Sequence, residues 1–200
     1  MKIICSDLEG VFVPEIWINV AQKTGIDELK LTTREISDYD VLMTKRLEVL
    51  DKHSLKLKDI TDIIATIEPL DGALEALNWI REQSQIIILS DTFEEFARPL
   101  MKKLNYPALL CHSLVIDDKG KIADYKLRQA NQKKQAIKAL KGLNYTTIAF
   151  GDSYNDTAML KEAHHGFFFR PPDNVVKEFP EFEVTHTYNE VKEKLTALLQ

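Results

Sequence analysis

The spacing of apolar residues changes along this chain. Between residues 15 and 70 they recur every three or four positions, which predicts helices at 15–24, within 29–52 and at 57–67. Gly25 is expected to end the first of these helices as a C-cap. The second is expected to carry one face made of Val41, Leu42, Arg46, Leu47 and Leu50. Because no convincing strand pattern occurs in this segment, it predicts a small helical insertion.

Outside this segment, short runs of consecutive apolar residues alternate with helical patterns. The runs at 2–6, 86–89, 146–150 and 166–169 are typical of strands buried on both faces of a parallel sheet, and shorter strands are expected at 108–111 and 184–187. Residues 114–127 predict a β-hairpin around a polar turn at 117–120. Helices are expected at 72–82, 93–104, 131–140 and 191–199, with one more ending at 163. The alternation predicts an α/β fold built on a parallel sheet.

Polar side chains follow three of the predicted strands: Asp7 and Glu9, Ser90 and Asp91, and Asp152, Asn155 and Asp156. Each group alone is explained by helix capping, and Asp91 or Thr92 is expected to be the N-cap of the helix at 93–104. Ligands of parallel α/β sheets bind beyond the carboxyl ends of the strands. Buried carboxylates also need a metal, a cation or hydrogen bonds to balance them. Three acidic strand ends together therefore predict a functional site.

Composition and charge exclude several classes of function. The chain has 200 residues, 44% of them hydrophobic and 28% charged, and a net charge of -5, which disfavours nucleic acid as its main partner. No apolar run approaches the length of a membrane span, and acids come too early for a signal peptide. Cys5 and Cys111 lack metal-ligand spacing and are expected to be buried, reduced thiols. We expect a cytoplasmic protein without membrane or nucleic-acid partners.

The motifs of several ligand-binding folds are missing. The seven glycines match neither the Gly-x-Gly-x-x-Gly turn of dinucleotide folds nor the P-loop, and the Gly-x-Ser-x-Gly elbow of serine hydrolases is absent. The strand ends offer carboxylates and a hydroxyl, and a lysine-rich stretch follows later in the chain. This donor set suits Mg²⁺ better than zinc, which prefers histidine and cysteine.

Four segments, taken in order, resemble the motifs of the haloacid dehalogenase-like superfamily of phosphotransferases, and most closely its phosphoserine phosphatase branch. They are Asp7-Leu8-Glu9-Gly10-Val11, residues 87–91, Lys133 and residues 151–156. The helical insertion lies directly after the first motif, where this branch carries its cap. The resemblance implies a three-layer, Rossmann-like core formed by residues 1–14 and 71–200, with a helical cap formed by residues 15–70.

The resemblance also assigns roles at the strand ends. Asp7 would be the nucleophile that forms an aspartyl phosphate, and Glu9 would exchange protons with the leaving and incoming groups. Mg²⁺ would be held by Asp7, Asp152 and the backbone carbonyl of Glu9. Ser90 would hydrogen-bond a phosphoryl oxygen. Lys133 would supply positive charge to the same group, with the neighbouring Lys134 as the alternative.

Further residues complete the implied substrate site. Asp91 and Asn155 are expected to contact the substrate, and Asp156 to support the metal ion or the lysine. A glutamate just past the first motif and a cap arginine bind the ammonium and carboxylate of the substrate in this branch, and Glu15 and Arg46 match those places. The planar fork of arginine suits a carboxylate. Without the resemblance, Glu15 would be read as a helix N-terminal acid and Arg46 as a solvated charge.

Two departures from the branch narrow the expected activity. Glu9 stands where most phosphatases of the superfamily have aspartate, and Asp91-Thr92 stand where most phosphoserine phosphatases have glycines. Together with the Asp-Tyr-Asp-Val-Leu-Met stretch at 38–43, these features resemble a bacterial subgroup of bifunctional phosphoserine phosphatases and homoserine phosphotransferases. The resemblance implies an enzyme of serine and threonine biosynthesis that passes the phosphoryl group of O-phospho-L-serine to water or to L-homoserine.

Two alternatives remain open from the sequence. The same fold and chemistry serve phosphatases of other small phosphate monoesters. A non-enzymatic phospho-acceptor module would also have an acidic site at the strand ends, although the full lysine and acid set and the large insertion argue against it.

Overall fold

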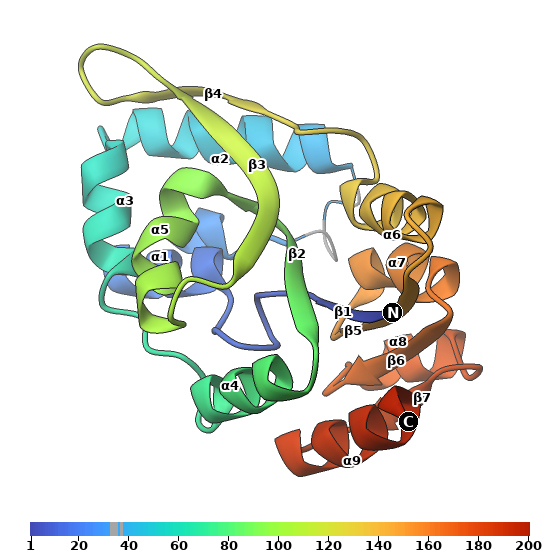
Figure 1. Ribbon diagram of the computed structural model, residues 1–200. Helices are drawn as coiled ribbons and strands as arrows, with labels where there is room; N and C mark the ends of the chain where they lie inside the picture. The colour runs from blue at the N-terminus through green and yellow to red at the C-terminus, as the bar shows by residue number, and fades with distance from the viewer. Residues whose placement is uncertain (33–35, 37) are drawn as a thin grey trace.

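The architecture is a seven-stranded sheet with helices on both faces, seen in a computed structural model that describes residues 1–32, 36 and 38–200 (Figure 1). The strand order is β4-β3-β2-β1-β5-β6-β7. The strands span Lys2–Ser6 (β1), Gln85–Phe93 (β2), Ala108–Ile116 (β3), Ile122–Lys126 (β4), Thr146–Gly151 (β5), His165–Phe169 (β6) and Glu183–Thr185 (β7). All neighbours are parallel except β3 and β4. The first strand therefore lies at the centre, between β2 and β5.

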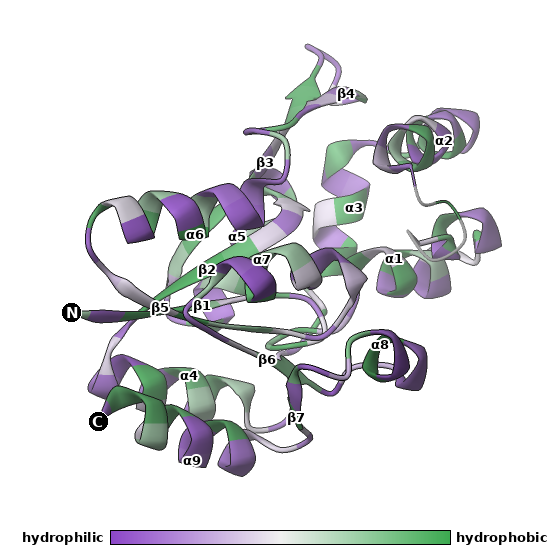
Figure 2. Ribbon diagram, turned by 90° about the vertical axis from the view of Figure 1, so that its right-hand side faces the viewer, coloured by the Kyte–Doolittle hydropathy of each residue, from purple (hydrophilic) through white to green (hydrophobic). Residues whose placement is uncertain are grey.

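Two apolar clusters, one on each face of the sheet, make the fold three-layered. Alternate residues along β1 and β5 face opposite ways, so that Ile4 and Ile148 join one cluster while Cys5 and Ala149 join the other. The first cluster includes helices α4 (Ala73–Gln83), α5 (Glu94–Lys103) and α9 (Tyr188–Leu199). The second includes α6 (Gln132–Gly142), α7 (Thr157–Glu162) and α8 (Asp173–Glu178). Figure 2 shows α4 and α9 on one side of the sheet and α6 and α7 on the other, which confirms the predicted α/β fold.

The insertion after β1 contains α1 (Ile16–Thr24), a short 3₁₀ helix η1 (Asp27–Lys30), α2 (Tyr39–Lys52) and α3 (Leu57–Ile64). It contains no strand among its described residues, and Gly25 ends α1 with a φ of 70°, as predicted. Residues 33–35 and 37 of the helical stretch expected at 29–52 lie outside the described part of the chain. Figure 2 places α1, α2 and α3 beyond the end of β1 that is opposite the N-terminus, so the insertion stands over the carboxyl ends of the strands.

The insertion is packed directly on the core. Residues of α1 and α3 belong to the same apolar cluster as α4 and α5, and the rings of Trp17 and Phe96 lie edge to face with centroids 5.5 Å apart. One prediction for α2 is wrong: Val41 is 55% exposed, and Met43 is buried in the face instead. The inward stripe starts one residue later than expected, because Leu42, Arg46, Val49 and Leu50 turn toward the core.

Three further predictions needed correction. Strand β2 does not end at residue 89 but continues to Phe93, and α5 starts after Phe93 with no side-chain cap. Asp91 and Thr92 are therefore not the N-cap, because the chain is still extended there. The predicted strand at 108–111 and the first arm of the hairpin form one strand, β3. Helix α8 was not predicted, because six residues after two prolines give too little periodicity.

The other helices and strands agree with the predicted pattern within a few residues. Cys5 is buried as expected, whereas Cys111 is half-buried, and both are free thiols. Within the described part of the chain, none of the helices combines the length and the apolar character that spanning a bilayer requires.

The hairpin of β3 and β4 contacts the insertion away from the chain connections. The backbone N–H of Leu57 donates to the carbonyl of Gly120 at 3.0 Å, and Lys121 Nζ lies 2.6 Å from Asp51 Oδ1. The hydroxyl of Tyr125 also contacts the Asp40 carboxylate. Figure 1 shows β4 lying along α2. The insertion is thus joined to the core at the hairpin as well as at its two ends.

Candidate active site

The predicted polar strand ends meet at one cavity of about 230 Å³ between the sheet and the insertion. Asp7 follows β1, Ser90 and Asp91 lie in the last part of β2, and Asp152 follows β5. Because these three strands are adjacent and parallel, their carboxyl ends lie side by side. The cavity is lined by the predicted residues Asp7, Glu9, Glu15, Arg46, Ser90, Asp91, Asp152 and Asn155. Two predicted residues, Lys133 and Asp156, do not line the cavity. Lys133 lies next to it and contacts both Asp7 and Asp156.

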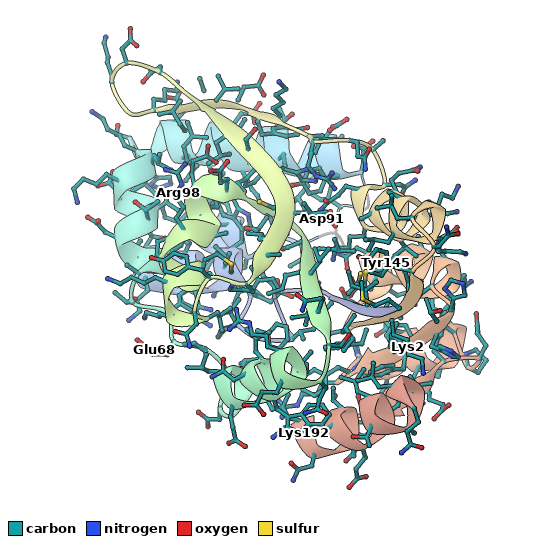
Figure 3. The ribbon with its side chains drawn as sticks, viewed as in Figure 1. Lys2, Glu68, Asp91, Arg98, Tyr145 and Lys192 are labelled. Atoms are coloured by element: carbon teal, nitrogen blue, oxygen red, sulfur yellow. The ribbon has the colours of Figure 1, made fainter. Side chains whose placement is uncertain are left out.

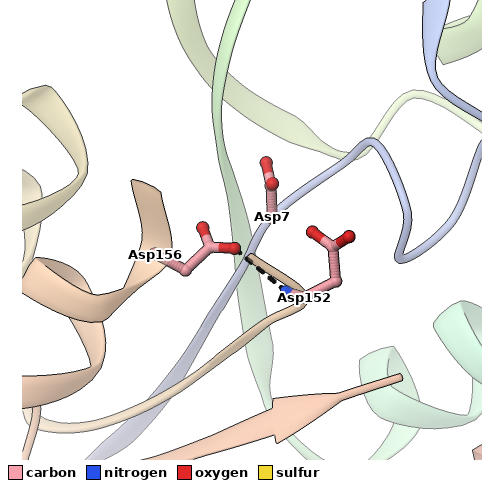
Figure 4. Close-up of side chains that lie close together, drawn as sticks. All are labelled: Asp7, Asp152 and Asp156. Carbon is pink, nitrogen blue, oxygen red and sulfur yellow. Dashed lines mark hydrogen bonds between the residues drawn. The ribbon is translucent and has the colours of Figure 1, made fainter. Parts of the chain in front are cut away.

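Three buried carboxylates form the centre of the site. Oxygens of Asp7, Asp152 and Asp156 all lie within 4.8 Å of one another (Figure 4). The Asp156 carboxylate accepts the backbone N–H of Asp152 at 3.0 Å, which fixes the loop after β5. Gly10 permits the close approach of the first loop: it has a φ of 71°, and a Cβ there would lie 2.3 Å from Asp152 Oδ2. The sequence therefore brings the acids together through backbone positions that leave no room for a side chain.

Lys133 is the cation of this cluster. Its Nζ lies 2.9 Å from Asp7 Oδ1 and 2.8 Å from Asp156 Oδ1, and the side chain is buried. Burial lowers the pKa of Lys133, but the carboxylates of Asp156, Asp7 and Asp91 outweigh it and raise the pKa well above its usual value. Among the described residues no such ion pair involves Lys134, which is half-buried. Of the two lysines that the sequence left open, the structure brings Lys133 to Asp7.

Carboxylates outnumber cations in this cluster, and three of the carboxyl groups have a raised pKa. Burial and the charge of Asp156 raise the pKa of Asp7 well above its usual value. Burial, Asp156 and Glu15 raise the pKa of Asp152 to about 7. Burial and Glu15 raise the pKa of Glu9 to about 8. A cluster of oxygen donors with uncompensated negative charge fits a hard divalent cation, which would neutralise it.

The wall formed by the insertion carries a buried cation of its own. The Arg46 guanidinium lies over the Trp17 ring at 4.6 Å and donates from Nη2 to the Leu31 carbonyl at 2.9 Å. Its Nε has no hydrogen-bond partner among the described residues, although the side chain is only 8% exposed. Burial lowers the pKa of Arg46 to about 10, so the group stays charged near neutral pH. The carboxylate of Glu9 accepts the N–H of Ile16 at 2.7 Å, which directs it beneath the start of α1.

Three residues around Asp91 were missed by the sequence analysis. Tyr39 donates its hydroxyl to the Asp91 carbonyl at 3.1 Å, and Gln132 donates to the Ser90 carbonyl at 2.5 Å. His112 Nε2 lies 3.6 Å from Asp91 Oδ1. Gln132 precedes the motif lysine and Tyr39 lies in the stretch 38–43, so both had a signal in the sequence. His112 had none, because only the pairing of β3 with β2 brings it to Asp91.

A comparison with known sequences identifies the family. The profile of the haloacid dehalogenase-like hydrolases matches residues 1–164. The chain belongs to this family of hydrolases. Within the family, a Pseudomonas aeruginosa protein named phosphoserine phosphatase ThrH is 58% identical over 192 residues, which cover 96% of this chain and 94% of that protein. A protein of Pseudomonas syringae pv. tomato named phosphoserine phosphatase is 55% identical over 194 residues, covering 97% and 82% respectively.

Solved structures of phosphoserine phosphatases support the fold. A structure of a phospho-aspartyl intermediate analogue of phosphoserine phosphatase superposes with a TM-score of 0.79 at 19% identity, covering 96% of this chain and 98% of that one. A substrate-bound phosphoserine phosphatase complex gives a TM-score of 0.79 at 20% identity, covering 96% and 97%. At these identities the likeness concerns the fold, and it agrees with the three-layer arrangement described above.

The close packing at Gly151 leads to a testable prediction. A Cβ on Gly151 would lie 2.3 Å from Asp156 Cγ, so Gly151→Ala is expected to displace the Asp156 carboxylate and lower kcat at least about tenfold. Gly142→Ala is the matched control, because a Cβ there meets nothing within 4 Å. Phosphatase assays and thermal melts of both variants test this. Equal activity in the two variants would mean that the position of Asp156 does not matter.

Proposed function

We propose that this protein is an Mg²⁺-dependent phosphoserine phosphatase that also transfers the phosphoryl group of O-phospho-L-serine to L-homoserine. The observation that carries the proposal is a buried guanidinium, Arg46, on the wall of a small cavity whose opposite side is the Asp7 cluster. Such a cavity suits a small phosphate monoester that also bears a carboxylate. The names of the two Pseudomonas relatives support the donor substrate.

The first half of the reaction uses Asp7 as nucleophile. Its carboxylate oxygen attacks phosphorus, the bond from phosphorus to the serine oxygen breaks, and the leaving oxygen takes a proton from Glu9. Ser90 hydrogen-bonds a phosphoryl oxygen, and Lys133 stabilises the charge on the phosphoryl group and on Asp7. Asp7, Asp152 and the carbonyl of Glu9 would hold Mg²⁺, which would neutralise charge and align the phosphoryl group. Asp156 supports Lys133 and the loop after β5.

The second half returns the enzyme to its starting state. Glu9 removes the proton of water or of the homoserine hydroxyl, the oxygen attacks phosphorus, and the bond between Asp7 and phosphorus breaks. Asp7 is thereby released as a carboxylate. Glu9 reaches one methylene further than aspartate, which gives room for an alcohol larger than water.

We propose that the insertion binds the amino-acid part of the donor substrate. Arg46 would bind its carboxylate and Glu15 its ammonium, and Asn155 would contact the substrate from the loop after β5. We propose accordingly that residues 15–70 act as a cap domain on a core formed by residues 1–14 and 71–200. The two free thiols, Cys5 and Cys111, are compatible with a cytoplasmic enzyme of amino-acid biosynthesis.

Phosphorus NMR of O-phospho-L-serine with enzyme and Mg²⁺, with and without L-homoserine, tests the function. We expect free phosphate in the first tube and phosphohomoserine in the second. Free phosphate alone would leave a plain phosphatase. Turnover only of other monoesters would leave a phosphatase of different specificity. No turnover of any monoester, with stable phosphorylation of Asp7, would indicate a phospho-acceptor module.

Replacing Arg46 should weaken recognition of the substrate more than it slows the chemical step. Arg46→Ala is expected to lower kcat/KM for O-phospho-L-serine by about 10²-fold, because the substrate carboxylate loses its buried partner. Activity on p-nitrophenyl phosphate, which has no carboxylate, should fall much less. Arg98→Ala is the control, because Arg98 lies on α5 away from Asp91 (Figure 3) and pairs with Glu94 in an exposed ion pair. Parallel losses on both substrates would remove Arg46 from carboxylate binding.

Metal binding should be visible without any turnover. At a Mg²⁺ concentration of about 100 Kd the melting temperature should rise by roughly 5–11 °C, the equivalent of about 2.7 kcal/mol. Asp152→Asn should remove most of this shift, because one charged ligand is lost. Asp62→Asn, which changes an exposed acid paired with Lys58, should keep it. An equal shift in both variants would place the ion elsewhere.

A further inference from the structure

Asp91 stands at the junction of two cavities. Beside the catalytic cavity lies a larger one of about 1000 Å³, and the two share Tyr39, Asp91 and Asn155 as lining residues. The Asp91 side chain is 33% exposed, so part of its carboxylate faces this shared space. In Figure 3 it lies near the carboxyl end of β2.

Two hydrogen bonds and two longer contacts to potentially charged groups, from three elements, surround this carboxylate. Gln132 Nε2 donates to Asp91 Oδ1 at 3.2 Å, and His112 Nε2 lies 3.6 Å from the same oxygen. Asn155 Nδ2 donates to Asp91 Oδ2 at 3.1 Å, and Lys133 Nζ lies 3.9 Å from this oxygen. These partners outweigh the effect of burial and hold the pKa of Asp91 below its usual value. A carboxylate so fixed remains an anion when a ligand arrives.

The ring of His112 is itself oriented by the backbone. The N–H of Arg128 donates to Nδ1 at 3.1 Å, so in the neutral ring the hydrogen is on Nε2 and points toward Asp91. Although His112 lines the larger cavity, both of its ring nitrogens are engaged, Nδ1 with the N–H of Arg128 and Nε2 with Asp91. It is therefore a positioning residue, as is Gln132.

The donor substrate leaves Asp91 unused. Glu15 and Arg46 both lie on the insertion side of the cavity, and they suffice for the ammonium and carboxylate that phosphoserine carries on one carbon. Burial lowers the pKa of Arg46, and the nearby Tyr39, Glu9 and Glu15 oppose this effect. Asp91 is a second anion on the opposite wall, close to the phosphoryl position marked by Lys133. Asp91 already lies 3.9 Å from Lys133 Nζ, and the exposed part of its carboxylate leaves an edge open to a cation of the ligand.

We propose that Asp91 binds the ammonium group of the acceptor alcohol, whose carbon chain lies in the space where the two cavities meet. This rests on the phosphotransferase activity proposed above. The acceptor hydroxyl attacks phosphorus from the place that the serine oxygen has left, its proton goes to Glu9, and the bond from phosphorus to Asp7 breaks. An acceptor with a longer chain than serine carries its ammonium further from the hydroxyl, and so beyond the reach of the same contacts. Primary alcohols that bear an ammonium group are the class of acceptor selected.

The test measures how the phosphoryl group of the phosphorylated enzyme is partitioned between alcohol and water. With O-phospho-L-serine and Mg²⁺, the ratio of phosphorylated alcohol to free phosphate is compared for 3-aminopropan-1-ol and for propan-1-ol, which lacks the ammonium group. This ratio does not depend on how fast the phosphoenzyme forms. We expect the wild-type protein to favour the amino alcohol about tenfold or more. Asp91→Asn should abolish the preference, so that the two alcohols give the same ratio within about twofold.

The supporting contact has its own variant. His112→Asn should lower the preference for the amino alcohol about threefold, and His53→Asn, an exposed histidine, should leave it unchanged. An equal ratio for the two alcohols in the wild-type protein, or an undiminished preference in Asp91→Asn, would overturn the proposal while the phosphotransferase stands. Should Asp91→Asn fail to fold, the wild-type comparison and His112→Asn decide. Release of phosphate with no transfer to any alcohol would overturn both the inference and the proposed transfer.

Discussion

Asp7→Asn is expected to lower kcat for O-phospho-L-serine by about 10⁴-fold or more, with hydrolysis and transfer lost together. The amide oxygen is a poor nucleophile, and in the proposed mechanism both reactions pass through the phosphorylated Asp7. Stopped assays of phosphate release and of phosphorylated acceptor measure the loss. Radiolabel from the phosphoryl group should also remain on acid-precipitated wild-type protein and not on the variant.

The fold of Asp7→Asn should remain intact. The amide still accepts the N–H of Leu8, which donates to Asp7 Oδ1 at 2.7 Å, and one negative charge is removed from a cluster with too many. The melting temperature without divalent cations should therefore not fall. Activity within about tenfold of the wild-type value, in a folded variant, would mean that another residue attacks phosphorus.

Lys133→Met is expected to lower kcat by about 10²–10³-fold and also to destabilise the protein. The charge opposite the phosphoryl group is lost, and the Asp7 and Asp156 carboxylates lose a buried partner. Breaking a buried pair costs about 3 kcal/mol or more, which corresponds to a melting temperature about 6–12 °C lower. Kinetics and thermal melts measure the two effects.

Lys134→Met is the matched control for this change. It removes the same functional group one residue further along α6, without touching the buried carboxylates, so activity and melting temperature should stay close to the wild-type values. Similar losses in both variants would indicate a general effect of charge on α6. Loss in Lys134→Met alone would reverse the choice between the two lysines.

Much of the fold and the site could be predicted because both follow from local patterns. Continuous apolar runs mark buried parallel strands, and the direction of those strands brings Asp7, Ser90 and Asp152 to one edge of the sheet. The helical spacing of residues 15–70 marked the insertion.

What the sequence did not predict depends on contacts between distant segments. The strand β2 runs on to Phe93 because β3 pairs with it as far as His112, although Ser90-Asp91-Thr92 has the composition of a helix cap. The environment of Asp91 follows from the same pairing and from Gln132, and no local pattern announces it. The choice between Lys133 and Lys134 likewise required knowing which side of α6 faces the sheet.

The contact between the β3–β4 hairpin and the insertion has a consequence for the exchange of substrates. A motion that takes α2 and α3 away from the hairpin would break the hydrogen bond between Leu57 and Gly120 and the ion pair between Lys121 and Asp51. The ion pair between the hairpin and the insertion is exposed to solvent, where salt screens it. In the proposed reaction, residues far from the chemistry would then influence how often water reaches the phosphorylated enzyme.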